Sequence, residues 1–236
     1  KGIPKYAGIY IPEAYNSFIN LLKPGLITQT NQEQIFTIIK EIPQYAGAAI
    51  PEAYESLISL LKLNLITPPT NQEQILRDFS NILKEIPQYA GDFTPAAYNS
   101  LINLLKLNLI TQTNQEQILK DFTSILKEIP KYARSSTYET YNTLTILLKS
   151  DLIIQTNQKQ IFSITKEIPQ YAGKGTPQAF KSLIGLLEAL KEKQINLTEG
   201  NLKIIINMIK EQGDVSITLD IIKDLVLEFR TPDKGQ

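Results

Sequence analysis

The feature that most constrains this chain is a five-residue pattern, Ile-Pro-x-Tyr-Ala, that recurs from one end to the other. It begins at Ile3, Ile42, Ile86, Ile129 and Ile168, so successive copies lie 39, 44, 43 and 39 residues apart. A second marker, Thr-Asn-Gln, alternates with it and begins at Thr30, Thr70, Thr113 and Thr156. A period of about 40 residues predicts tandem structural repeats, and two markers per period predict two helices in each repeat.

Apolar residues within each period follow helical spacing. Tyr54, Leu57, Ile58 and Leu61 lie three and four residues apart, which places them on one face of a helix. The pattern predicts helices at residues 12–23, 31–41, 51–63, 71–85, 95–107, 114–128, 157–167 and 177 to about 193. Between the two markers, residues 71–87 are four longer than residues 31–43. The addition lengthens a helix by about one turn without rotating its apolar face.

The two markers also predict where helices begin and end. Thr30 and Glu33 have the spacing of a capping box, in which two side chains satisfy free backbone donors at a helix start. Ile-Pro is expected to end one helix in every repeat, because the residue before a proline avoids the helical conformation.

The repeats stop before the chain does. Residues 197–210 and 217–229 are amphipathic but lack Ile-Pro-x-Tyr-Ala, as expected for a terminal cap that covers the last apolar face of a repeat array. The predicted organisation is therefore an array at 1–193, capping helices at 194–230 and a frayed tail at 231–236. The predicted fold is all-α, a right-handed α-solenoid of about five two-helix repeats of 39–44 residues with a divergent C-terminal cap.

Composition excludes several classes of function. The 24 basic and 24 acidic residues cancel, which removes the overall positive charge typical of proteins that grip nucleic acid. The chain has no Cys and no His, and it contains no nucleotide-binding loop or zinc-ligand spacing. No apolar run reaches the length of about 18 residues that spans a bilayer. We therefore expect no enzyme activity, no cofactor, no metal and no membrane insertion.

Two sets of repeat-aligned residues are candidates for binding a partner. The first, which we call the polar row, follows the Tyr or Phe of each repeat's first helix and should point away from the core: Asn16, Glu55, Asn99, Asn142 and Lys181. The second, the turn row, comprises the Tyr residues of the Ile-Pro-x-Tyr-Ala pattern, chiefly Tyr45, Tyr89 and Tyr132. Each set has a simpler explanation: the polar row as a solvated face that contacts nothing, and the tyrosines as packing between hairpins.

In pattern, the paired-helix repeats resemble the α-solenoid proteins, meaning the tetratricopeptide, pentatricopeptide and HEAT types, over about residues 3–193. Thr140-Tyr141-Asn142-Thr143-Leu144 and Ala97-Tyr98-Asn99-Ser100-Leu101-Ile102 look like the opening helix of a pentatricopeptide repeat. That family implies binding of single-stranded RNA, although its repeats are shorter than these and its members are typically basic. The tetratricopeptide consensus requires a Trp, and this chain has none.

The leading functional hypothesis is a non-enzymatic scaffold that binds another protein or a peptide through one face of the array. The alternative is a pentatricopeptide-like protein that binds single-stranded RNA. The abundance of Ile, Asn and Lys is typical of AT-rich genomes, in which such arrays often serve as effectors that act on a host. The sequence does not identify a cellular compartment, but it favours a soluble protein of the cytoplasm or of a host cytoplasm.

Overall fold

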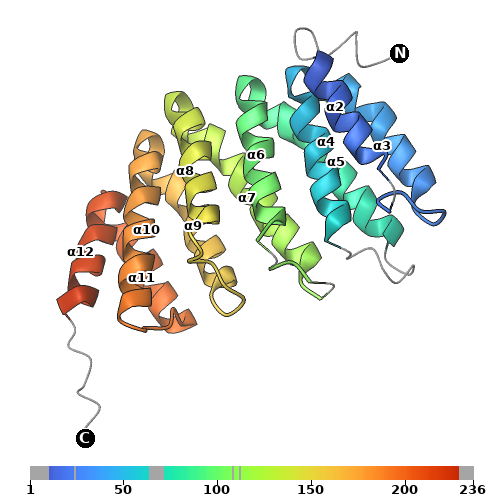
Figure 1. Cartoon of the computed structure of the whole chain (residues 1–236). Coiled ribbons are helices and arrows are strands. Elements are labelled where there is room, and N and C mark those ends of the chain that lie inside the picture. Colours follow the sequence, from blue (N-terminus) through green and yellow to red (C-terminus); the bar gives the residue numbers. More distant parts are fainter. Residues whose placement is uncertain (1–10, 24, 64–71, 108, 112, 229–236) are drawn as a thin grey trace, which may run out of the picture. The chain divides into compact units, whose positions relative to one another are not determined.

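The structure is a computed structural model that describes residues 11–228, apart from 24, 64–71, 108 and 112 (Figure 1). These residues form helices and no β-strand, which confirms the prediction of an all-α chain. Tyr6, the first Tyr of the repeated pattern, and the predicted tail at 231–236 lie outside the described residues. The α-helices are α2 (Ile11–Leu21), α3 (Gln32–Tyr45), α4 (Ile50–Lys62), α5 (Gln72–Ala90), α6 (Thr94–Leu105), α7 (Gln115–Ala133), α8 (Thr137–Lys149), α9 (Gln158–Ala172), α10 (Thr176–Glu192), α11 (Glu199–Gln212) and α12 (Val215–Glu228). Short 3₁₀ turns join the second helix of one repeat to the first helix of the next: η2 (Gly47–Ala49), η3 (Gly91–Phe93), η4 (Arg134–Ser136) and η5 (Gly173–Gly175).

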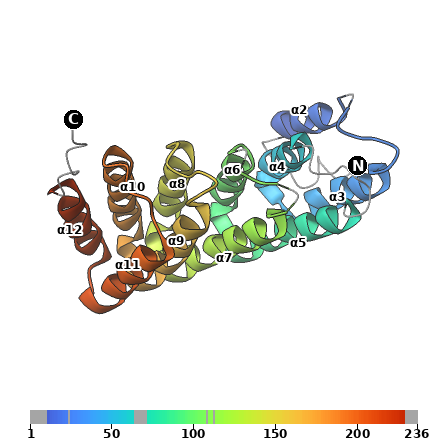
Figure 2. The ribbon, with the colours of Figure 1, turned by 90° about the horizontal axis from the view of Figure 1, so that it is seen from below.

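The chain divides into two compact units, Lys1–Lys127 and Glu128–Gln236. In the first unit, α4 packs between α2 and α6 to form one layer, while α3 packs against α5 in a second layer (Figure 2). The ring of Phe18 on α2 meets the ring of Tyr54 on α4 at a centroid distance of 6.0 Å. Because each helix is apolar on one face, stacking neighbours in two layers buries those faces between them.

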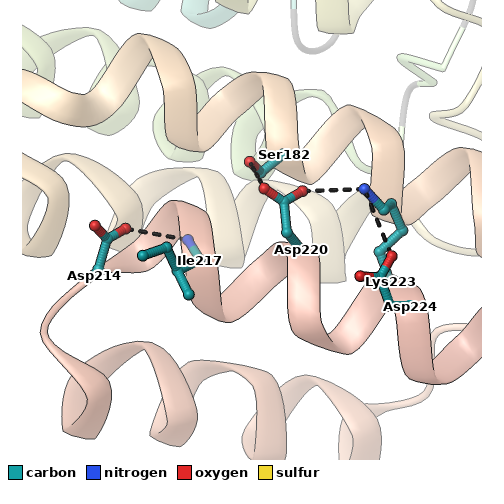
Figure 3. Close-up of polar contacts among 6 residues, drawn as sticks. All are labelled: Ser182, Asp214, Ile217, Asp220, Lys223 and Asp224. Carbon is teal, nitrogen blue, oxygen red and sulfur yellow. Dashed lines mark hydrogen bonds and ion pairs between the residues drawn. The ribbon is translucent and has the colours of Figure 1, made fainter.

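The second unit repeats the same pairing, with α10 between α8 and α12 and with α9 against α11. The close contact of α10 and α12 is visible in Figure 3, where the Ser182 hydroxyl donates to Asp220 Oδ2 at 3.1 Å. Lys223 Nζ lies 3.3 Å from the other oxygen of Asp220, and the aliphatic part of the Lys223 side chain packs over Gly185.

On α12 itself, Ile217, Ile221 and Leu225 point outward and are more than half exposed. This end of the unit therefore presents an apolar stripe to solvent.

The prediction that Ile-Pro ends a helix is wrong. Pro43, Pro87, Pro130 and Pro169 all lie inside helices. After the first of these, α3 continues to Tyr45. A proline inside a helix removes one backbone donor and leaves the carbonyl four residues earlier without its usual partner.

The tyrosine of the next helix supplies the missing donor. Tyr54 Oη donates to the carbonyl of Ile39 at 3.3 Å, and Tyr98 Oη donates to that of Leu83 at 2.6 Å. Ile39 lies four residues before Pro43, and Leu83 four residues before Pro87. The repeated Pro and the repeated Tyr are therefore coupled, because the hydroxyl of one satisfies the carbonyl that the other leaves free.

Helix ends depend on glycine at the turn. Gly47, Gly91 and Gly173 each begin a 3₁₀ turn with φ near +54°, a conformation that costs glycine little. Arg134 takes this place in the fourth repeat with φ +50°, and a residue with a Cβ is strained there.

The predicted capping box is not formed. The asparagine after Thr30 precedes α3 with no side-chain bond to the helix start. Its amide instead binds the preceding loop, since Asn31 Oδ1 accepts from the Thr28 N–H at 2.7 Å and Nδ2 donates to the Leu26 carbonyl. Asn114 and Asn157 make the same pair of bonds. The Thr-Asn-Gln marker thus fixes a loop through its Asn rather than capping a helix through its Thr.

Candidate functional site

The polar row is accessible to solvent. Asn16, Asn99, Asn142 and Lys181 are exposed and Glu55 is half-buried. Asn16, Glu55 and Asn99 belong to α2, α4 and α6 of the first unit, whereas Asn142 and Lys181 belong to α8 and α10 of the second. Lys181 Nζ lies 3.2 Å from Glu139 Oε1 on the neighbouring helix. A binding role for this row stays a prediction.

The turn row is less accessible than its Gly-rich surroundings suggest. Tyr45, Tyr89 and Tyr132 are half-buried, and the hydroxyls of Tyr45 and Tyr89 are buried. Burial, followed by the charges of Glu41 and Tyr54, raises the pKa of Tyr45. Lys127 Nζ from the next repeat lies 6.0 Å from the Tyr89 ring, and Lys131 lies 4.5 Å from that of Tyr132. The rings of Tyr89 and Tyr132 therefore each lie within cation–π distance of a lysine ammonium group.

Lys127 also belongs to a set of ion pairs between successive helices of the second layer. Lys84 of α5 lies 2.8 Å from Glu41 of α3, and Lys127 of α7 lies 2.5 Å from Glu85 of α5. In the second unit, Lys210 of α11 lies 3.7 Å from Glu167 of α9. These pairs are partly exposed, so each contributes at most about 1 kcal/mol. In the first unit, the Lys of one Lys-Glu pair and the Glu of the preceding one thus link neighbouring hairpins.

A groove lies between α5 and α7 in the first unit and has a volume of about 580 Å³. Six α5 residues and seven α7 residues line what we call the α5–α7 groove: Gln74, Ile75, Asp78, Asn81, Ile82, Glu85, Gln115, Glu116, Leu119, Lys120, Thr123, Ser124 and Lys127. The side chains of Ile75, Ile82 and Leu119 are largely buried and form its apolar floor. Polar side chains such as Asp78 and Glu116 form its rim. An apolar floor with a polar rim is typical of a ligand-binding site.

The neighbouring groove, between α3 and α5, is smaller at about 310 Å³. Helix separation and helix length both contribute to this difference, because α3 and α5 are in closer contact than α5 and α7. Counted back from their prolines, α5 and α7 each begin four residues earlier than α3. The extra turn of each long helix contributes Gln74 and Ile75 on one side, and Gln115 and Glu116 on the other. Two long helices side by side therefore give a groove one turn longer than a long helix beside a short one.

In the second unit, a hollow of about 570 Å³ lies between the loop after α8 and the end of α10. Both amide ends of Asn157, which lines it, already bind the backbone of the α8–α9 loop. The side-chain amide of Asn157 is thus already used to hold this loop.

The groove residues were not predicted from the sequence, because the polar row lies on the first helix of each repeat and the turn row lies at the C-terminal ends of α3, α5 and α7. The sequence did contain a signal for the groove: the second helices of two successive repeats, predicted at 71–85 and 114–128, are each four residues longer than the one predicted at 31–41.

Within the described residues, no helix is long and apolar enough to cross a membrane. The same residues contain no group of three or more Asp or Glu side chains placed to hold a metal ion.

Comparison with other proteins finds no family model, no curated protein and no solved structure that matches this chain. The likeness to helical-hairpin families is accordingly a likeness of sequence pattern.

Proposed function

We propose that this chain is a non-enzymatic scaffold that binds another protein through an exposed face of a helical repeat array. We further propose that its hairpins form a right-handed α-solenoid of about five repeats, in which the helices after residue 193 act as the cap. The side-by-side packing of successive hairpins within each unit supports this arrangement. Neighbours that bury each other's apolar faces are the basis of solenoid folds.

The observation that carries the proposed function is the α5–α7 groove. From Gln74 to Glu85 it follows twelve residues of α5, whose eleven steps of 1.5 Å give about 16 Å of helix. An extended peptide rises about 3.3 Å per residue, so roughly five residues would lie along it. The groove is thus the right length for a short segment of a partner protein.

The charges of the groove favour a protein over RNA. Three carboxylates line it, those of Asp78, Glu85 and Glu116, against two lysines. A surface that binds nucleic acid neutralises phosphates with Lys and Arg. RNA binding through the polar row stays the alternative, because Asn99 and Asn142 are exposed in neighbouring repeats.

The test is to fill the groove and measure binding of a purified partner recovered from the cells that make this protein. Ser124 of α7 lines the α5–α7 groove, and Thr37, which has the same position in α3 relative to the helix-internal proline, lines the α3–α5 groove. Ser124→Trp should weaken binding at least tenfold, about 1.4 kcal/mol. Thr37→Trp should change it little, and both variants should unfold at the temperature of the parent.

A third variant decides between the two faces. Changing Asn99, Asn142 and Lys181 together to Ala should leave partner binding intact if the groove is the site. Loss of binding in this variant, with Ser124→Trp unaffected, would move the site to the polar row. Recovery of RNA instead of protein, seen as nucleic acid absorbance in the purified material, would favour the alternative function.

A further inference from the structure

The two ends of the α5–α7 groove differ in chemistry. At the end nearest the C-termini of the helices, Lys127 and Glu85 pair across it at 2.5 Å, so their charges are already compensated. At the opposite end lie the carboxylates of Asp78 and Glu116, with Lys120 one turn further along α7. Asp78 Oδ1 accepts from Gln74 Nε2 at 2.7 Å. A carboxylate can accept several hydrogen bonds, so Asp78 retains capacity for another donor.

A buried amide lies at the same end. Gln115 is 7 % exposed, and its Oε1 is buried with no hydrogen-bond partner among the described residues. A buried acceptor without a donor costs about 1–3 kcal/mol. Because this oxygen has almost no exposed surface, the amide has to rotate toward the groove before a ligand N–H can reach it and recover that free energy. Gln115 is the first residue of α7, the place that Gln32 takes in α3.

Acceptors therefore gather near one end of the groove, and aliphatic residues run along its floor from Ile75 to Ile82. Three acceptor groups, Asp78, Glu116 and Gln115, match a side chain with several N–H donors and a positive charge. The arginine guanidinium has five donors in a planar fork, whereas lysine concentrates its donors on one nitrogen. Ile75, Ile82 and Leu119 match an aliphatic side chain a few residues away.

We infer that the α5–α7 groove recognises a short basic and aliphatic segment of a partner protein, with an arginine held by Asp78, Glu116 and Gln115 and an aliphatic side chain on Ile75, Ile82 and Leu119. This inference rests on the proposed function and adds the chemistry of the partner. A phosphate or an acidic peptide would meet the carboxylates and is disfavoured.

The chain offers a matched pair of variants to test this. Glu116 and Glu33 follow the same Asn-Gln pair and occupy the first turn of α7 and of α3. Glu116→Lys and Glu33→Lys make the same change of charge at the same place in a helix, but only Glu116 lines the α5–α7 groove. Any general effect of charge or of the helix dipole is therefore common to both.

The probe is a displayed library of random twelve-residue peptides selected on the whole chain. We expect selected peptides to share an arginine and an aliphatic residue within about five positions. For one such synthetic peptide, Glu116→Lys and Asp78→Lys should each weaken binding at least tenfold, and Glu33→Lys less than twofold. Replacing the peptide's arginine with lysine should weaken binding, and replacing it with glutamine should weaken it more.

The outcomes separate the inference from the proposed function. Selected peptides that lack basic residues but lose affinity for Ser124→Trp would overturn the inference and leave the groove as a binding site. Equal losses in Glu116→Lys and Glu33→Lys would also overturn it, because the effect would then be general. Failure to select any peptide, or selection of peptides that bind Ser124→Trp as well as the parent, would overturn both.

Discussion

Tyr98 in the first unit and Phe180 in the second occupy the same place in their repeats, and both are fully buried. Leu83 lies four residues before Pro87, and Thr165 lies four residues before Pro169. Tyr98 follows Leu83 by 15 residues, and Phe180 follows Thr165 by 15 residues. Tyr98 donates its hydroxyl to the Leu83 carbonyl at 2.6 Å, whereas Phe180 has no hydroxyl to offer. The ring is therefore the common requirement of the site, and the hydrogen bond is an addition in repeats that carry Tyr.

The largest effect should come from removing the ring. Tyr98→Ala should lower the free energy of unfolding by about 3 kcal/mol, because it opens a cavity and leaves the Leu83 carbonyl without its donor. Chemical denaturation monitored by circular dichroism measures this. Tyr138, which is 58 % exposed, provides the control, since Tyr138→Ala should cost less than about 0.5 kcal/mol. A loss below that figure for Tyr98→Ala would contradict the packing role.

A pH series tests the buried hydroxyls together. Burial raises the pKa of Tyr54 to about 12 and raises the pKa values of Tyr98 and Tyr141 as well. An unfolded tyrosine ionises near pH 10, so these neutral hydroxyls contribute their full stability below that pH. The contribution falls as pH rises through 10 toward 12, by up to about 1.4 kcal/mol per pH unit for each tyrosine.

The measurement is the denaturation midpoint at about pH 8, 10 and 11, with tyrosinate absorbance recorded in parallel. In Tyr98→Phe the decline above pH 10 should be shallower than in the parent. Tyrosinate absorbance that rises fully near pH 10 before unfolding would show that the hydroxyls are accessible.

The smallest effect should come from exchanging the hydroxyl between the two positions. Tyr98→Phe should cost about 1 kcal/mol, the net value of one buried hydrogen bond. Phe180→Tyr should add up to about the same amount if the new hydroxyl reaches the carbonyl of Thr165, four residues before Pro169. Both are read at neutral pH from denaturation midpoints. Destabilisation by Phe180→Tyr would show that the second unit cannot accommodate the hydroxyl there.

Much of the fold follows from local sequence. The period of the Ile-Pro marker and the three-and-four spacing of apolar residues predict helices close to those observed, such as 51–63 against α4 at Ile50–Lys62. Burial of Tyr54 and Tyr98 follows from the same spacing. Tyr15, at the equivalent place in α2, is 41 % exposed. The spacing of a residue predicts which face of its helix it lies on, whereas the tertiary structure decides which neighbouring helices cover that face.

Tertiary structure decided what the repeated prolines and the candidate site do. From sequence, Pro43 and Pro87 predicted helix ends, because a proline withdraws a donor from the helix that contains it. The donor that compensates Pro87 comes from Tyr98, which packing alone brings to Leu83. The four-residue additions, by contrast, can be read from the sequence alone, and they make α5 and α7 one turn longer than α3. Only the pairing of α5 with α7 turns that length into a groove, because a groove needs two surfaces and each helix supplies one.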